Sequence, residues 1–136
     1  LSPIHPPAET QCIAKVIDWP LALKRTGDKE ELAIEMLTGL LESLPDFKAN
    51  ITQALHKKDS VQLKTLIHKL NGACCYTGVP SLTMICHEIE TQLKKEMTLE
   101  HLEPEFLEFF EQIELVLEQA PTLLSKLNDR ISETEL

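Results

Sequence analysis

The chain has 136 residues, 43% of them hydrophobic, so it is long enough for one domain with a buried core and too short for two ordinary domains. Its formal net charge of −9 argues against nucleic acid or an anionic membrane surface as the partner and favours another protein. No apolar run approaches the roughly 18 residues of a membrane span, so we expect no direct membrane contact. Because the sequence begins with Leu1 and not Met, we expect it to be a segment of a longer protein.

The start of the chain has neither a helical nor a strand pattern. Three prolines within LSPIHPPAETQ predict a linker or extended arm, which we place at residues 1–16. Asp18 then precedes Trp19 and Pro20 in the order typical of an N-cap followed by an early proline. This order predicts a short helix that ends near Thr26.

The next segment, from Lys29 to Lys58, has apolar residues at helical spacing over most of its length. It is predicted to form one long amphipathic helix. Pro45 removes a backbone donor from its interior and should kink the helix or split it near Ser43. A cap at Asp59 or Ser60 is then predicted to open the following helix.

Three further helices follow at the same apolar spacing. The first contains the stretch VQLKTLIHKLNGACCYTG and is expected to end at Gly78, and the second begins at Pro80 and ends near 94–97. The third runs from about Leu102 to Ile131 and contains Pro121, so a kink or break is expected there as well.

No segment shows the alternating β-branched pattern of a strand. Four long amphipathic helices with short links predict an all-α fold, an antiparallel four-helix bundle with a short extra N-terminal helix. We assign the bundle domain to residues 17–131 and a tail to residues 132–136.

His68 is the candidate functional residue. At about 100° per residue, the apolar side chains of its helix gather on one face, and His68 falls nearly opposite the centre of that face. Gly72 lies one turn further on the same side, where a glycine costs about 1 kcal/mol against alanine but leaves room for a large partner. The residues of the core face are Leu63, Leu66, Ile67, Leu70, Ala73 and Cys74.

An exposed imidazole suits phosphoryl transfer. Its unperturbed pKa of about 6.5 leaves one ring nitrogen with a lone pair at neutral pH, and this nitrogen is able to attack phosphorus without a separate base. Lys64 and Lys69 offer positive charge nearby, and Asn71 offers a neutral hydrogen bond. Since the chain has no P-loop, no Gly-rich nucleotide loop and no acidic metal cage, we expect no ATP-dependent kinase activity of its own.

The run HKLNGAC, from His68 to Cys74, followed by Gly78, resembles the phosphoacceptor motif of histidine-containing phosphotransfer (Hpt) domains. HKLNGACCYTGVPSL, with the later IETQL and LEPEFLEFF, looks like the Hpt domain of hybrid sensor kinases of the BarA/GacS type. The similarity covers about Ile17 to Ala120 and is most specific from His68 to Pro80. It implies a helical bundle with an exposed histidine midway along one helix.

The resemblance also implies the partners. His68 is then expected to take a phosphoryl group from an aspartyl phosphate on the receiver domain of the parent kinase and to pass it to a response regulator of the GacA/UvrY type. No cofactor is expected on this chain, and Mg²⁺ is expected on the receiver. The resemblance further implies a cytoplasmic domain of an inner-membrane sensor kinase, and we expect the isolated domain to be monomeric.

The chain departs from the family at one important position. Many Hpt domains carry a lysine three residues after the histidine, where this chain has Asn71. Lys64 or Lys69 is a candidate to replace that cation. The full set of residues expected to contact the phosphoryl group or the partner is Lys64, Lys69, Asn71, Gly72 and Cys75.

The short turn near Gly78 predicts a neighbour for His68. An antiparallel hairpin places residues equidistant from its turn side by side, so residues 87–90 should lie level with His68. Glu90 then becomes a candidate to hold one imidazole N–H and leave the other nitrogen free. The alternative is that Glu90 is a solvated surface charge.

Two other functions fit a helical domain with an exposed histidine. A kinase dimerisation and phosphoacceptor domain is expected to carry an acidic residue just after the histidine and a proline a few positions on, whereas Lys69 and Gly72 occupy that region here. A non-catalytic helical adaptor, in which His68 is incidental, is the other alternative.

The cysteines give little support to a metal site. Cys12, Cys74, Cys75 and Cys86 form no CxxC pair or disulfide framework, which is typical of reduced thiols in a cytosolic setting. Cys75 shares a helix face with His68, but a spacing of i and i+7 is too long for both to bind one ion. We therefore expect no metal site.

Overall fold

The computed structural model describes residues 15–96 and 98–135, with side chains as far as Arg130. This part of the chain contains helices and no strand, so the all-α prediction is confirmed. Most of the arm expected at residues 1–16, together with Cys12, lies outside the described residues. The helices are α2 (Trp19–Arg25), α3 (Glu30–His56), α4 (Ser60–Cys74), α5 (Pro80–Lys94) and α6 (Glu103–Glu135).

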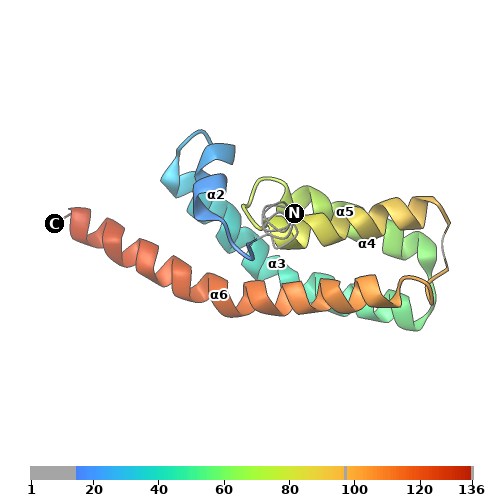
Figure 1. Cartoon of the computed structure of the whole chain (residues 1–136). Helices are drawn as coiled ribbons and strands as arrows, with labels where there is room; N and C mark the ends of the chain where they lie inside the picture. Colours follow the sequence, from blue (N-terminus) through green and yellow to red (C-terminus); the bar gives the residue numbers. More distant parts are fainter. Residues whose placement is uncertain (1–14, 97, 136) are drawn as a thin grey trace, which may run out of the picture.

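The four long helices form the predicted antiparallel bundle. Helix α4 packs against α3 and α5, and α6 packs against α5 and α3, which closes the bundle (Figure 1). Helices α4 and α5 have 15 residues each, or about 22 Å, whereas α3 has 27 and α6 has 33. The longer pair therefore extends past the shorter pair at one end, where α2 packs against α3.

Two of the predicted helix caps are present. The Asp18 carboxylate accepts a hydrogen bond from the backbone N–H of Leu21 at 3.1 Å and so opens α2. Asp59, rather than Ser60, caps α4 by accepting from the N–H of Gln62 at 3.1 Å. Both caps satisfy an amide that the first helical turn leaves without a partner.

Two predicted helix ends are wrong. Helix α4 ends at Cys74 and not at Gly78, and residues 75–78 form a turn that is held by contacts with α2. The guanidinium of Arg25 donates to the Cys75 carbonyl at 2.7 Å, and the Asp18 N–H donates to the Gly78 carbonyl at 2.9 Å. Helix α6 continues to Glu135, so residues 132–135 belong to the helix and do not form a separate tail.

Of the two outcomes predicted at Pro45, a kink or a split near Ser43, the split does not occur. Helix α3 runs unbroken through Pro45, and α6 runs unbroken through Pro121. Buried residues such as Leu44 and Ile51 lie on both sides of the first proline. Burial of an amphipathic face contributes most of a helix's stability in a protein, and here it offsets the missing backbone hydrogen bond.

The core fixes the orientation of α4. Leu63, Ile67 and Leu70 are completely buried and point into the bundle, so the opposite face of α4 is turned outward. Phe109 of α6 is the largest completely buried side chain in the core. Among the helices of residues 15–96 and 98–135, none combines the length and the apolar character needed to cross a membrane.

Candidate functional site

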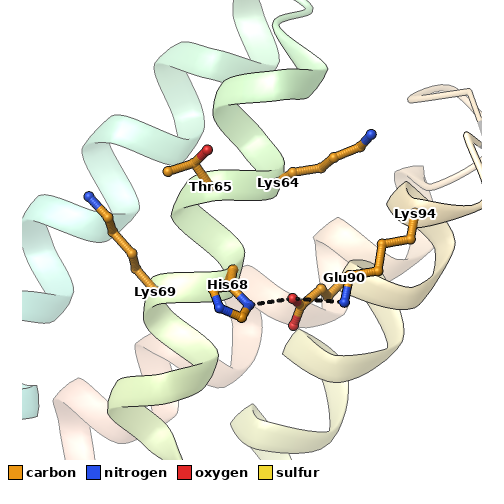
Figure 2. Close-up of a pocket in the computed structure, with 6 residues that line it drawn as sticks. All are labelled: Lys64, Thr65, His68, Lys69, Glu90 and Lys94. Carbon is orange, nitrogen blue, oxygen red and sulfur yellow. Dashed lines mark hydrogen bonds and ion pairs between the residues drawn. The ribbon is translucent and has the colours of Figure 1, made fainter.

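His68 lies in the middle of α4, on the face turned away from the core. Its side chain is 75% exposed, as the helical spacing predicts. It borders an open hollow of about 360 Å³ between α4 and α5 (Figure 2). The residues that line this hollow are Lys64, Thr65, His68, Lys69, Glu90 and Lys94.

Glu90 of α5 is hydrogen-bonded to His68. Nδ1 of the imidazole lies 2.6 Å from Oε2 of the carboxylate, and the Glu90 side chain is only 8% exposed. The neighbour predicted from the hairpin is therefore in place, and Glu90 is not a solvated surface charge. Its role in orienting the ring remains a prediction.

Two more residues complete the surroundings of the carboxylate. The Asn71 amide donates to Oε1 of Glu90 at 3.0 Å, and the Lys94 amine lies 3.4 Å from Oε2. Burial alone would raise the pKa of Glu90, but the hydrogen bonds from Asn71 and His68, with the charge of Lys94, outweigh it. The pKa of Glu90 therefore lies below its ordinary value of 4.5, and the group is ionised at neutral pH.

The ionised carboxylate determines which ring nitrogen of His68 carries the hydrogen. A carboxylate only accepts hydrogen bonds, so Nδ1 must be the donor in the pair. In the neutral ring Nε2 then keeps its lone pair, and this nitrogen points away from Glu90 (Figure 2). The arrangement presents Nε2 of His68 as a nucleophile.

The other residues expected at the site are placed differently from one another. Lys64 and Lys69 line the hollow, but Figure 2 shows their amines pointing away from the ring. The side-chain amide of Asn71 donates its hydrogen bond to Glu90 and not to the histidine. A Cβ added to Gly72 meets nothing within 4 Å, so the surface beside the histidine is open there.

Cys75 is not brought into the hollow. Because α4 ends at Cys74, Cys75 lies in the following turn and borders a separate depression near α2, beside Arg25. Its side chain has intermediate exposure, and its thiol is free, as are the buried thiols of Cys74 and Cys86. Among the described residues, no three His, Cys, Asp or Glu side chains are grouped so as to hold a metal ion.

Sequence reasoning did not find Lys94 as a site residue. A lysine in the last turn of a helix is ordinarily explained by its favourable interaction with the helix dipole. Because that explanation accounts for Lys94, no role at the site was predicted for it. The signal was nevertheless present, because the hairpin register that places Glu90 level with His68 also places Lys94 level with Lys64. Thr65 was missed for a simpler reason. Its hydroxyl donates a hydrogen bond to the Val61 carbonyl within the same helix, and no sequence motif marks it as a site residue.

Comparison with known proteins places this geometry in a family. Residues 35–133 match the Hpt domain family. The chain is 39% identical over 108 residues to the signal transduction histidine-protein kinase BarA of Shigella flexneri, and equally to BarA of Escherichia coli K12. The sensor histidine kinase GacS of Pseudomonas protegens is 38% identical over 82 residues, or 60% of this chain.

These matches cover a small part of each kinase and most of this chain. The aligned region is 79% of this chain but 12% of either BarA protein, and it is 9% of GacS. The crystal structure of the Hpt domain from a sensor hybrid histidine kinase of Shewanella matches with a TM-score of 0.79 and 40% identity, over 82% of this chain and 95% of that domain. The chain belongs to the Hpt domain family.

Proposed function

We propose that the chain is a phosphorelay intermediate, in which His68 accepts a phosphoryl group from an aspartyl phosphate of a receiver domain and passes it to an aspartate of a response regulator. The observation that carries the proposal is the hydrogen bond between His68 and Glu90, which fixes Nδ1 and leaves Nε2 for phosphorus. Membership in the Hpt family supports it, because Hpt domains of BarA and GacS kinases work in phosphorelays.

The transfer needs no separate base on this chain. The lone pair on Nε2 of His68 forms a bond to phosphorus while the bond from phosphorus to the aspartyl oxygen breaks, and the aspartate leaves as a carboxylate. The ring keeps the hydrogen on Nδ1 and becomes positively charged. Glu90 faces that nitrogen with a negative charge, so it stabilises the charge that develops during the step.

The same geometry serves the second transfer. When the regulator's aspartate attacks phosphorus, the bond to Nε2 breaks and the ring returns to the neutral form with its hydrogen still on Nδ1. Glu90 holds the ring throughout, so His68 need not reorient between donor and acceptor. We expect Mg²⁺ on the receiver domain rather than on this chain.

The proposed docking surface for both partners surrounds the hollow. Gly72 leaves open space beside His68, and Lys64 and Lys69 add positive charge at its rim. A receiver that carries a phosphoryl group and acidic residues is complementary to that charge. Lys64, Lys69 and Gly72 are therefore assigned to partner contact.

We further propose that the chain is the Hpt part of a BarA/GacS-type hybrid kinase of the inner membrane, that it lies on the cytoplasmic side, and that the isolated domain is a monomer. Its partners are then the receiver domain of the same kinase and a response regulator of the GacA/UvrY type. The similarity to BarA and GacS supports this assignment over a kinase dimerisation domain or a non-catalytic adaptor.

The test is transfer of radiolabelled phosphate. The chain is mixed with a receiver domain that carries labelled aspartyl phosphate, and the appearance of acid-labile, base-stable label on the chain is followed. A response regulator is then added to remove it. Label on the wild type, none on His68→Gln, and loss of label to the regulator are expected, whereas label retained on His68→Gln would refute the assignment.

A further inference from the structure

The hollow beside His68 contains three lysines, and they are not equivalent. The amine of Lys94 reaches the Glu90 carboxylate, whereas the amines of Lys64 and Lys69 point away from the ring (Figure 2). Lys94 comes from α5, across the hollow from the histidine. It is thus the lysine of the three whose charge lies against the carboxylate that holds the reacting ring.

Asn71 cannot act as the cation beside the phosphoryl group, which is the role that a lysine commonly has at this position in the family. Its amide donates to Oε1 of Glu90 at 3.0 Å, so it helps to hold the carboxylate that holds the ring. A neutral amide in that place also adds no charge to offset a phosphoryl group. The cation at the site must therefore come from another residue.

The position of Lys94 meets this need. Its Nζ and the Nδ1 of His68 both lie against the same oxygen, Oε2 of Glu90, at 3.4 and 2.6 Å. The lysine side chain is 69% exposed and flexible, so packing does not fix its amine on Glu90. We propose that Lys94 contacts the phosphoryl oxygens when His68 is phosphorylated and supplies the cation that Asn71 does not; this inference rests on the proposed function.

The charges favour this exchange of partners. In the form that attacks phosphorus the ring carries no charge, and Lys94 is the cation that faces Glu90. After Nε2 has formed its bond to phosphorus, the ring itself is positive and faces Glu90 at Nδ1, while the phosphoryl group carries about two negative charges. Lys94 then has a more strongly charged partner than the carboxylate it leaves, and no proton has to move.

The test separates contact with the phosphoryl group from docking of the receiver. His68 is phosphorylated by phosphoramidate, a small donor that needs no partner, and the pKa of the phosphoryl group is measured by ³¹P NMR. Signals from other histidines are removed by comparison with His68→Gln. Lys94→Gln is expected to raise the pKa of the phosphoryl group by about half a unit, because a nearby cation favours the dianion.

Transfer from a phosphorylated receiver is measured on the same proteins. Lys94→Gln is expected to slow it about tenfold, the effect of losing one charged hydrogen bond. Lys94→Arg should stay within about threefold of the wild type because it keeps the charge. Lys64→Gln, Lys69→Gln and the adjacent Lys95→Gln are matched controls that should leave the pKa of the phosphoryl group unchanged.

Each other outcome is decisive. An unchanged phosphoryl pKa in Lys94→Gln, with or without slower transfer, overturns the inference, because Lys94 then acts at most in docking. A larger rise in Lys64→Gln or Lys69→Gln also overturns it. Both results leave the proposed function intact as long as the receiver labels the wild type and not His68→Gln. The proposed function itself is removed by a wild type that takes no label, or by label retained on His68→Gln.

Discussion

The imidazole of His68 and the carboxylate of Glu90 are joined across α4 and α5 by a hydrogen bond of 2.6 Å, although the two residues lie 22 positions apart in the sequence. The ring is three-quarters exposed, while the carboxylate is almost completely buried. One nitrogen of the histidine is therefore anchored in the protein, and the other is presented to a partner.

The contribution of Glu90 is divided between orientation and charge by two substitutions. Glu90→Ala removes both and is expected to slow transfer from the receiver by about 10- to 100-fold, the usual effect of losing a residue that orients a functional histidine. Glu90→Gln keeps an acceptor for Nδ1 but loses the charge, so it should fall between the alanine variant and the wild type. Stopped-flow or quench-flow transfer kinetics measure both.

A second readout follows the ring itself. ¹⁵N NMR should show the hydrogen on Nδ1 of His68 in the wild type and a mixture of the two neutral forms in Glu90→Ala. Glu88→Gln changes an exposed carboxylate on the same helix and serves as control. If Glu90→Ala leaves both the transfer rate and the position of the hydrogen unchanged, Glu90 does not orient His68.

The lowered pKa of Glu90 makes part of the stability depend on pH. A carboxyl group whose pKa is lower in the folded state stabilises the fold above its unfolded value, here about 4.5, and loses that contribution as the pH falls through the folded value. The difference in unfolding free energy between wild type and Glu90→Gln should therefore be greatest near pH 7 and shrink below about pH 4.5. Urea unfolding at several pH values measures it, and a difference that stays constant would contradict the account.

Gly72 provides a test of the docking surface. Because a Cβ there meets nothing, Gly72→Ala should stabilise the fold by up to about 1 kcal/mol through its higher helix propensity. Gly72→Trp should slow transfer from the receiver at least about tenfold by obstructing the approach, while phosphorylation by phosphoramidate stays unchanged. Gly39→Trp, at another open helical glycine outside the hollow, is the control, and an equal loss in both tryptophan variants would argue against docking at Gly72.

Gly78 is expected to be essential to the turn between α4 and α5. Its φ is +76°, and an added Cβ would lie 2.6 Å from the Cβ of Ala22 and 2.9 Å from the Asp18 carbonyl oxygen. Gly78→Ala should cost about 2–4 kcal/mol of unfolding free energy from backbone strain and crowding. Gly27 has a similar φ of +64° but open surroundings, so Gly27→Ala should cost only about 1 kcal/mol. Thermal and urea unfolding compare the two, and equal costs would show that crowding at Gly78 is relieved.

The fold could be predicted because the helices of this chain carry their signals locally. The apolar spacing, the caps at Asp18 and Asp59 and the early prolines each depend on neighbours in the sequence. The end of α4 could not be predicted in this way, because residues 75–78 leave the helix and form hydrogen bonds with α2. One of these bonds runs from the guanidinium of Arg25 to the Cys75 carbonyl. The continuity of α3 through Pro45 depends on packing of the same kind, between helices.

The site was predictable as far as it follows one helix or a hairpin register. The helical spacing placed His68 outside the core, and the register placed Glu90 beside it. Where the polar groups point is set by contacts between helices, so the amide of Asn71 and the amine of Lys94 could not be assigned to Glu90 beforehand. Cys75 was misplaced because the predicted helix was one turn too long.

The central claim is that Nε2 of His68 receives the phosphoryl group, and locating the phosphorus tests it most directly. The chain, labelled with ¹⁵N in its histidines, is phosphorylated by a receiver domain that carries aspartyl phosphate, and the ³¹P–¹⁵N coupling is measured by NMR. The account predicts a single phosphorylated nitrogen, Nε2 of His68, with the hydrogen retained on Nδ1. Phosphorus on Nδ1 of His68, or on another histidine such as the exposed His87, would contradict it.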